Sequence, residues 1–216
     1  ADTFDALIDG AMMNNPLAGA WKIGADDISF TVEKEFTDLA TGQYILYSGE
    51  RVASWDMGFT YGEAVSGSFE MAGATVKASS ATAVGAGTVA PATTTRIMNA
   101  VSDLSGIEID GVVFTGCLQS VQLSVNNNLR PAECLGSDTP GDQILGTAEV
   151  TGSIEAYLTD TTQAWYNDKV LNQTKFSIKF AIADGTSIYE FNIPNARISG
   201  DSPAAGGINT DVMVSV

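Results

Sequence analysis

The chain has 216 residues, with 10 lysine and arginine residues against 26 aspartate and glutamate residues, a formal charge of −16, and no histidine. This length is enough to bury a core, as one large β domain or two small ones. The acidic charge argues against a nucleic-acid-binding face, and the lack of histidine excludes a Ser-His-Asp triad, a Cys-His pair and His-ligated zinc.

The two cysteines and the apolar segments exclude further classes. Cys117 and Cys134 are too few for a disulfide framework and their spacing fits no metal motif, so we expect both to be reduced packing residues. No apolar run reaches the length of a membrane span, and the first residues lack the basic and apolar regions of a signal peptide. We therefore expect a soluble protein that has no export signal, binds no cofactor or metal, and does not associate with a membrane.

The first third of the chain is punctuated by turn residues. Residues 1–24 are predicted to form an extended N-terminal arm. Apolar alternation predicts a strand over 28–36 and a short strand over 44–47, which Ser48-Gly49-Glu50 ends with a turn.

A predicted hairpin and a long loop come next. Trp55, Met57, Phe59 and Tyr61 alternate with polar or small residues, which predicts a half-buried strand over 54–61. Gly62-Glu63 then turns the chain into a return strand over 65–71. Residues 72–95 consist almost wholly of Ala, Thr, Gly, Ser and Val, so we expect a long, flexible loop or arm there.

The middle of the chain is predicted to hold three further strands. A short helical turn over 97–104 precedes a strand over 107–114 that Asp110-Gly111 breaks. The alternation of Val121, Leu123 and Val125 with polar residues predicts a strand over 118–126, and another strand is expected over 150–158.

One helix and a hairpin complete the prediction. The helix is expected from a cap at Asp160 or Thr161 to Leu171, with Ala164, Trp165 and Val170 buried. A hairpin turn at 184–187 follows, and Pro194-Asn195 is expected to end its second strand. The predicted fold is mainly β, a β-sandwich or partial barrel with one flanking α-helix.

A short strand pattern occurs twice. Residues 65–70 read VSGSFE and residues 150–155 read VTGSIE, and each copy follows a strand of similar style. Since alternate residues of a strand face opposite sides, the two similar hairpins are predicted to form a four-stranded wall with one apolar and one polar face. The predicted polar face consists of Ser54, Asp56, Thr60, Ser66, Ser68, Glu70, Gln122, Ser124, Asn126, Thr151, Ser153 and Glu155.

This predicted polar face contains no basic residue. No lysine or arginine occurs between Arg51 and Lys77, between Arg96 and Arg130, or between Arg130 and Lys169. An ordinary solvated sheet face carries lysine, which blocks edge pairing and aids solubility. The gaps therefore indicate a specialised surface, although an acidic chain with few basic residues also produces such gaps by chance.

The order of these elements over residues 28–216 resembles the major tail tube protein of long-tailed, siphovirus-type bacteriophages. The resemblance rests on the hairpin ending in VSGSFE, on LQSVQLSVNNN at 118–128, on Leu135-Gly136, on GTAEVTGSIEAY at 146–157, and on the final helix, hairpin and IPNARI at 193–198. The Ala/Thr-rich segment at 72–95 has no counterpart in this pattern.

The resemblance implies a structural virion protein that forms rings of six subunits, stacked into a hollow tube. The polar face would line the lumen, through which viral DNA passes without specific binding. The implied partners are further copies of the chain and the tape-measure, tail terminator and tail-tip proteins. The implied location is the virion tail, with the host cytoplasm before assembly.

The resemblance also implies a single tail-tube-like domain over 1–216, with the arm at 1–24, a first half at 28–71, the flexible loop at 72–95 and a second half at 107–216. The arm and the loop are expected to become ordered when rings stack. Inter-ring contacts are therefore expected at Val76, Lys77, Val84 and Val89.

Three alternatives remain open at this point. An enzyme such as a glycosidase needs only two carboxylates, but no pair is marked by a motif, and no catalytic residue is predicted. An extracellular adhesin or carbohydrate-binding module would need converging aromatic side chains, whereas Trp21, Trp55 and Trp165 are scattered. A capsid decoration protein is the nearest competitor among β-sandwich proteins of the virion.

Overall fold

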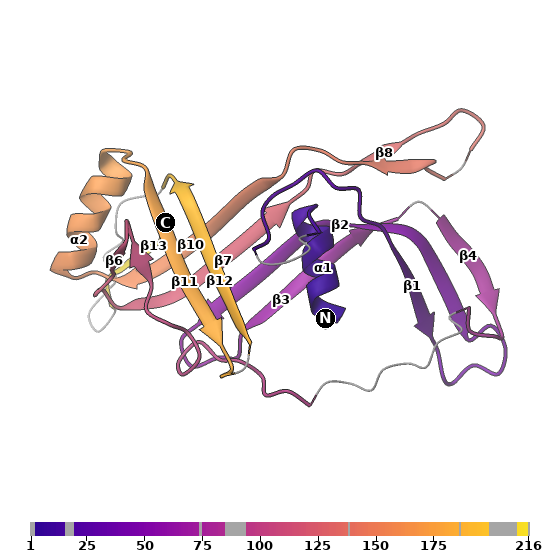
Figure 1. The fold of residues 1–216 in the computed structure, drawn as a ribbon, viewed down its shortest axis with the longest axis horizontal. Helices are drawn as coiled ribbons and strands as arrows, with labels where there is room; N and C mark the ends of the chain where they lie inside the picture. Colours follow the sequence, from indigo (N-terminus) through magenta and orange to yellow (C-terminus); the bar gives the residue numbers. More distant parts are fainter. Residues whose placement is uncertain are drawn as a thin grey trace. The chain divides into compact units, whose positions relative to one another are not determined.

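The computed structural model describes residues 3–15, 20–73, 75–84, 94–137, 139–185, 187–198 and 211–215. These residues form a mainly β structure with two α-helices and one π-helical turn among them, which confirms the predicted fold class (Figure 1). Within the described ranges the sheets are open and do not close into a barrel. The strands are β1 (Phe30–Glu35), β2 (Tyr44–Thr60), β3 (Ser66–Ala72), β4 (Thr75–Ser80), β5 (Glu108–Ile109), β6 (Val112–Val113), β7 (Leu118–Asn126), β8 (Arg130–Ala132), β9 (Asp142–Ile144), β10 (Glu149–Tyr157), β11 (Phe176–Ala183), β12 (Ile188–Ala196) and β13 (Met213–Ser215). The helices are α1 (Thr3–Met12), α2 (Asp160–Tyr166) and the π-helix η1 (Asn167–Leu171).

The largest sheet contains the predicted wall. Its order is β1-β2-β7-β10-β13, and both β3 and β4 pair with β2. The strands β3, β2, β7 and β10 are therefore consecutive neighbours, and we call these four strands the wall. A second sheet has the order β12-β11-β5-β6, and β8 and β9 form a separate two-stranded sheet.

The chain divides into two compact units. Unit 1 holds residues 1–56, 68–93 and 124–151, and unit 2 holds residues 57–67, 94–123 and 152–216. Each wall strand contributes residues to both units, so neither unit corresponds to a continuous half of the chain.

The core of unit 2 has the sandwich packing expected from the sequence. Phe59 on β2 contacts Phe180 on β11 edge-to-face, with ring centroids 5.2 Å apart, and Val121 and Ile154 belong to the same buried cluster. Burial of such aromatic and aliphatic side chains is the main stabilising contribution to a fold of this kind.

The N-terminal residues of unit 1 are helical, so the prediction of an extended arm over 1–24 was wrong. Ile8 and Ala11 lie one helical turn apart, and both are buried. Figure 1 shows α1 over β2, where a Cβ on Gly10 would lie 3.2 Å from the Val52 side chain. The helix ends at Met12, and the next residue, Met13, has a left-handed φ of 49°.

Strand β2 runs without interruption for 17 residues, so the predicted turn at Ser48-Gly49-Glu50 was wrong. Gly49 has a φ of 71°, and the pairing with β1 shifts there from Phe30↔Glu50 to Thr31↔Ser48. Gly49 therefore forms a β-bulge that the sequence pattern alone presents as a turn.

The long loop predicted at 72–95 is partly a strand. Residues 75–80 form β4, which pairs antiparallel with β2 from Ser48↔Thr75 to Tyr44↔Ser80. Residues 74 and 85–93 lie outside the described ranges.

Two predicted strand ends need correction. Asp110 and Gly111 both have positive φ, 52° and 74°, and form the turn of the β5–β6 hairpin, where we predicted one broken strand. Pro194 does not end β12, which continues to Ala196. The pairing of β12 with β11 shifts between Ile178↔Ile193 and Phe176↔Ala196, so Pro194 lies at an irregularity of an edge strand, where proline is tolerated.

The predicted helix at 160–171 consists of α2 and η1. Thr159 is the N-cap in place of Asp160 or Thr161, and it forms a capping box with Thr162. Trp165 and Val170 are buried as predicted, but Ala164 is exposed, and Thr162, Tyr166 and Lys169 are buried instead. The buried residues 162, 165, 166, 169 and 170 have the i, i+3, i+4, i+7 spacing of a single helix face, and Ala164 does not lie on that face.

Both cysteines are exposed free thiols, so their predicted role as packing residues was wrong. Residues 97–104, predicted as a helical turn, form hydrogen-bonded turns flanked by the isolated bridges Ala64↔Asn99 and Leu104↔Ile182.

Candidate functional site

In unit 1, strands β2 and β3 place hydroxyl and carboxylate groups side by side. Ser54 Oγ donates to Glu70 Oε2 at 3.1 Å, and Ser68 Oγ donates to Asp56 Oδ2 at 3.4 Å. On the opposite face Trp55 stacks on Phe69, with ring centroids 6.0 Å apart. The predicted division of these strands into a polar and an apolar face is therefore present in unit 1.

In unit 2, strands β7 and β10 repeat this arrangement. Ser120 Oγ donates to Glu155 Oε2 at 3.1 Å, while Val121 and Ile154 face the core. Ser120 is absent from the predicted polar set, although it continues the alternation of Gln122, Ser124 and Asn126 by two residues. Extending that alternation by one step would have found it.

None of the twelve predicted polar-face residues is buried. Ser54, Thr60, Ser124 and Ser153 are half-buried, and the other eight are exposed. The repeated Gly152 has a specific function, because a Cβ there would lie 2.5 Å from the carbonyl oxygen of Gln122. Glycine at this position thus permits the close approach of β10 to β7.

The single basic residue of β2 does not contribute to an exposed face. Arg51 is only 8% exposed at its side chain, and its guanidinium is hydrogen-bonded to Asp27 and Asp142 at 2.6 to 2.8 Å. These contacts lower the pKa of both carboxyls below the ordinary aspartate range, chiefly through the Arg51 bond at Asp27 and the Gln143 backbone N–H at Asp142. Arg51 therefore ties the segment after α1 and the β8–β9 hairpin to β2, and leaves the polar face free of positive charge.

A family model described as phage tail tube protein matches residues 2–216, nearly the whole chain. The chain belongs to the phage tail tube protein family. No curated protein matches it. Family membership makes this a structural protein that assembles into the tail tube and is located in the virion tail.

The predicted inter-ring residues of this tail tube protein lie on or near β4. Val76 and Lys77 are exposed on β4, and Val84 is exposed beyond its end, where its backbone N–H donates to Glu33 Oε2 at 2.7 Å. Val89 lies outside the described residues. The first three all belong to unit 1, with Val76 and Lys77 on β4 and Val84 bonded to β1.

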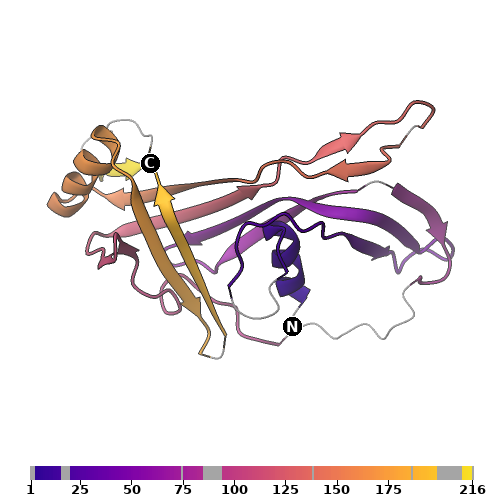
Figure 2. The ribbon, with the colours of Figure 1, turned by 45° about the horizontal axis from the view of Figure 1, so that its top comes forward.

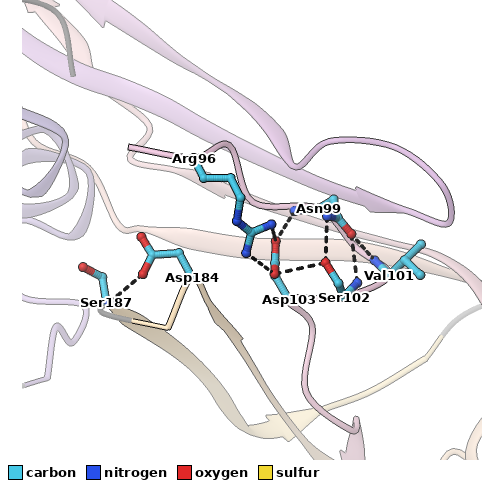
Figure 3. Close-up of polar contacts among 7 residues, drawn as sticks. All are labelled: Arg96, Asn99, Val101, Ser102, Asp103, Asp184 and Ser187. Carbon is cyan, nitrogen blue, oxygen red and sulfur yellow. Dashed lines mark hydrogen bonds and ion pairs between the residues drawn. The ribbon is translucent and has the colours of Figure 1, made fainter. Parts of the chain in front are cut away.

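A cluster of polar contacts fixes the chain of the tail tube protein after residue 94 (Figure 3). Asp103 accepts a bidentate bond from Arg96, a bond from the Asn99 backbone N–H at 2.8 Å and one from Ser102 Oγ at 3.1 Å. The Arg96 bond is the largest of the effects that lower the pKa of Asp103 from 3.8 to about 2. The cluster holds a turn that is bonded to β11 through the Asp103 carbonyl and the Ala183 N–H.

We expect Asp103→Asn to destabilise unit 2 at pH 7 but to have little effect at pH 2. Because the folded pKa of about 2 lies below the unfolded value of 3.8, the ionised carboxyl stabilises the fold above pH 3.8. That stabilisation is lost as the pH falls toward 2, where wild type and variant should converge. Urea unfolding at both pH values measures the difference in unfolding free energy between wild type and variant. A difference that is the same at pH 7 and pH 2 would contradict the stabilising role of the ionised Asp103 carboxyl.

Other site classes find no support among the described residues. No group of three or more acidic or cysteine side chains within the described ranges is placed to hold a metal ion. None of the described helices has the length and hydropathy to cross a membrane.

Proposed function

We propose that the chain forms hexameric rings, which stack into the tail tube, and that each copy contributes its wall to a continuous barrel around the lumen. The supporting observation is that both outer strands of the wall have unpaired edges. Within the described residues β3 pairs with β2 alone, and β13 pairs with β10 only from Glu155 to Tyr157. Residues 149–154 of β10 therefore have an edge to which β3 of a neighbouring copy can add.

Edge pairing around a ring removes a hazard of the isolated chain. An open strand edge is a template for uncontrolled pairing, and ring closure satisfies it with a defined partner. A head-to-tail contact that closes by rotation gives a ring, and a second head-to-tail contact along the axis gives a filament. We infer that residues 1–216 act as a single domain in this assembly, because all four wall strands are shared by both units.

The polar face of the wall is proposed to line the lumen and to let viral DNA slide without binding. Each of Asp56, Glu70 and Glu155 accepts a hydrogen bond from a serine hydroxyl on the adjacent strand. This bond holds the carboxylate against the sheet. A lumen with lysine or arginine would bind phosphates and release counterions, whereas a wall of carboxylates and hydroxyls repels the polyanion. The proposed role is structural, without catalysis or a cofactor.

Stacking is proposed to use the surface around β4, with Val76, Lys77 and Val84, and Val89 from the segment outside the described residues. Val76 and Val84 are apolar and about 60% exposed, and such exposed apolar groups are typical of contact surfaces. The tape-measure, terminator and tail-tip proteins are proposed as the other partners, with assembly in the host cytoplasm.

Negative-stain microscopy of concentrated purified protein tests the assembly directly. Hollow tubes with six-fold end views are expected. Protein that remains monodisperse and monomeric under every condition that assembles other tail components would contradict the proposal.

The lumen assignment predicts that Glu70→Lys with Glu155→Lys slows DNA ejection about tenfold, because new lysines on the wall bind phosphates. Tube assembly should be unchanged, since both side chains are exposed. Release of DNA from purified phage measures the effect, and raised salt should relieve it. Asp38→Lys with Glu63→Lys, at exposed turns, makes the same charge change off the wall and serves as the control. Equal ejection by both variants would place the lumen elsewhere.

A further inference from the structure

The β8–β9 hairpin is held firmly at its base. Asp142 bonds to buried Arg51, the Gln143 side-chain amide donates to the Gly73 carbonyl at 3.0 Å, and the Gly146 N–H donates to the Asn127 carbonyl at 3.1 Å. Figures 1 and 2 both show the hairpin leaving the ends of β7 and β10 as a separate projection. A rigid base with a projecting end is suited to presenting a contact surface.

The end of this hairpin is apolar and carries an unpaired carboxylate. It surrounds an open cavity of about 520 Å³ lined by Pro131, Glu133, Cys134, Leu135 and Pro140, among others. Leu135 is fully exposed, and Glu133 has no ion-pair partner among the described residues. We call this the hairpin cup. An exposed leucine on an ordered hairpin has no evident role in folding.

A surface of opposite character lies in unit 2. Phe176 pairs with Ala196 at the end of β11 and β12, and Lys175 and Arg197 are the residues next to this pair along the chain. Both are exposed, and neither has an ion-pair partner in the part of the chain that the structure describes. Like charges in this arrangement are unfavourable in the free chain, and Asp168 does not neutralise them because it bonds to Lys169 and Thr174.

An exposed leucine completes this second surface. Leu171, at the end of η1, is 63% exposed, and Gln173 ties this segment to the end of β12 by donating to the Val170 and Ile198 carbonyls. We call Leu171, Lys175 and Arg197 the basic patch. The basic patch has one exposed apolar side chain and two positive charges, whereas the hairpin cup has one exposed leucine and the negative charge of Glu133.

We infer that the hairpin cup of one copy binds the basic patch of a second copy in the next ring. The inference rests on the proposed stacking of rings. A head-to-tail contact needs two different, complementary surfaces on each copy, and these two surfaces match in apolar character and in charge.

Charge exchange tests the contact. Glu133→Lys alone, and Lys175→Glu with Arg197→Glu alone, should each slow tube elongation about tenfold, because complementary charges at an interface rim mainly raise the association rate. Combining all three changes should restore elongation to within about threefold of wild type. Light scattering measures elongation, and microscopy checks that tubes form. Glu190→Lys reverses an exposed charge that is paired with Lys179 of the same chain, and serves as the control.

The outcomes separate this inference from the proposed function. Failure of the wild type to form rings and tubes contradicts both. Wild-type tubes, with normal elongation of each charge variant or no recovery in the combination, overturn only the cup–patch contact. Loss of DNA binding in Lys175→Glu with Arg197→Glu, at normal elongation, would show that the basic patch serves a polyanion instead.

The natural thiols give a second measurement on the unaltered contact. Cys134 lies in the hairpin cup, whereas Cys117 precedes β7 and is exposed elsewhere. In Cys117→Ser protein, labelling of Cys134 by a maleimide should slow at least about tenfold when tubes form. Cys134→Ser protein reports Cys117 under the same conditions. Unchanged labelling of Cys134 in intact tubes would contradict burial of the cup.

Discussion

Replacing both Asp27 and Asp142 by alanine is expected to lower the free energy of unfolding by about 3–5 kcal/mol, because it leaves the Arg51 guanidinium buried without a counter-charge. The Arg51 side chain is only 8% exposed, while the Asp27 and Asp142 side chains are 59% and 58% exposed. Only the guanidinium is buried. The loss of unfolding free energy therefore depends on whether the arginine or the aspartates are removed.

Removing Arg51 itself should cost much less. In Arg51→Met the two carboxylates regain water at their exposed sites, and the methionine fills most of the buried volume, so we expect a loss of about 1 kcal/mol. Urea unfolding at pH 7 compares the two variants. A larger loss in Arg51→Met than in the double aspartate variant would mean that the carboxylates, and not the guanidinium, are the groups that need a partner.

The same group predicts a pH dependence with a definite sign. The pKa values of Asp27 and Asp142 are lowered in the folded state, so their ionised forms stabilise the fold above the unfolded pKa of 3.8. That contribution is lost as the pH falls through the lowered folded values. The double alanine variant lacks both groups, so its deficit relative to wild type should shrink below about pH 4.

The wall could be predicted from the sequence because its information is local. Trp55 and Phe59, or Val121 and Leu123, recur at the two-residue period of a half-buried strand, and the repeated VSGSFE and VTGSIE mark equivalent strands. The pairing of β3 with β2 and of β7 with β10 follows once each hairpin is recognised, but the adjacency of β2 and β7, which joins the two hairpins, does not.

The elements that were missed depend on contacts distant in sequence. Gly49 reads as a turn residue, and only its pairing with β1 makes it a bulge within a long strand. Residues 75–80 lack large side chains, so their strand is imposed by β2 and not by their own propensity. The helix α1 is short and is stabilised by packing on β2, which a local pattern does not show.

The candidate surface likewise has parts that local sequence predicts and parts that depend on contacts distant in sequence. Alternation within each strand identified the exposed carboxylates Asp56, Glu70 and Glu155, but their serine partners depend on register between strands. The joining of Asp27 and Asp142 by Arg51 spans 115 residues of sequence (142 − 27), and no local signal predicts it. The hairpin cup and the basic patch likewise appear only once strand pairing is known.

Asn127 makes one such long-range contact, which connects α1 to the wall. Its side chain is buried, and its Nδ2 donates to the carbonyls of Ala11 at 3.0 Å and Val52 at 2.9 Å. Ala11 belongs to the last turn of α1, whose carbonyls have no partner within the helix. One buried amide therefore caps the helix and bonds to β2 at the same time.

Asn127→Ala is expected to lower the free energy of unfolding by about 2–4 kcal/mol, since it removes a buried donor to the carbonyls of Ala11 and Val52 and leaves a cavity. Asn127→Asp, which keeps the shape, should cost more at pH 7 because it sets a carboxylate against those carbonyls, and its deficit should shrink as acid protonates the new group. Urea unfolding measures both, with Asn195→Ala on exposed β12 as the control. Hydrogen exchange of the α1 amides should accelerate in both Asn127 variants before the wall opens. If α1 stayed as protected as in wild type, the helix would be held by packing against Val52 and Phe30 rather than by this amide.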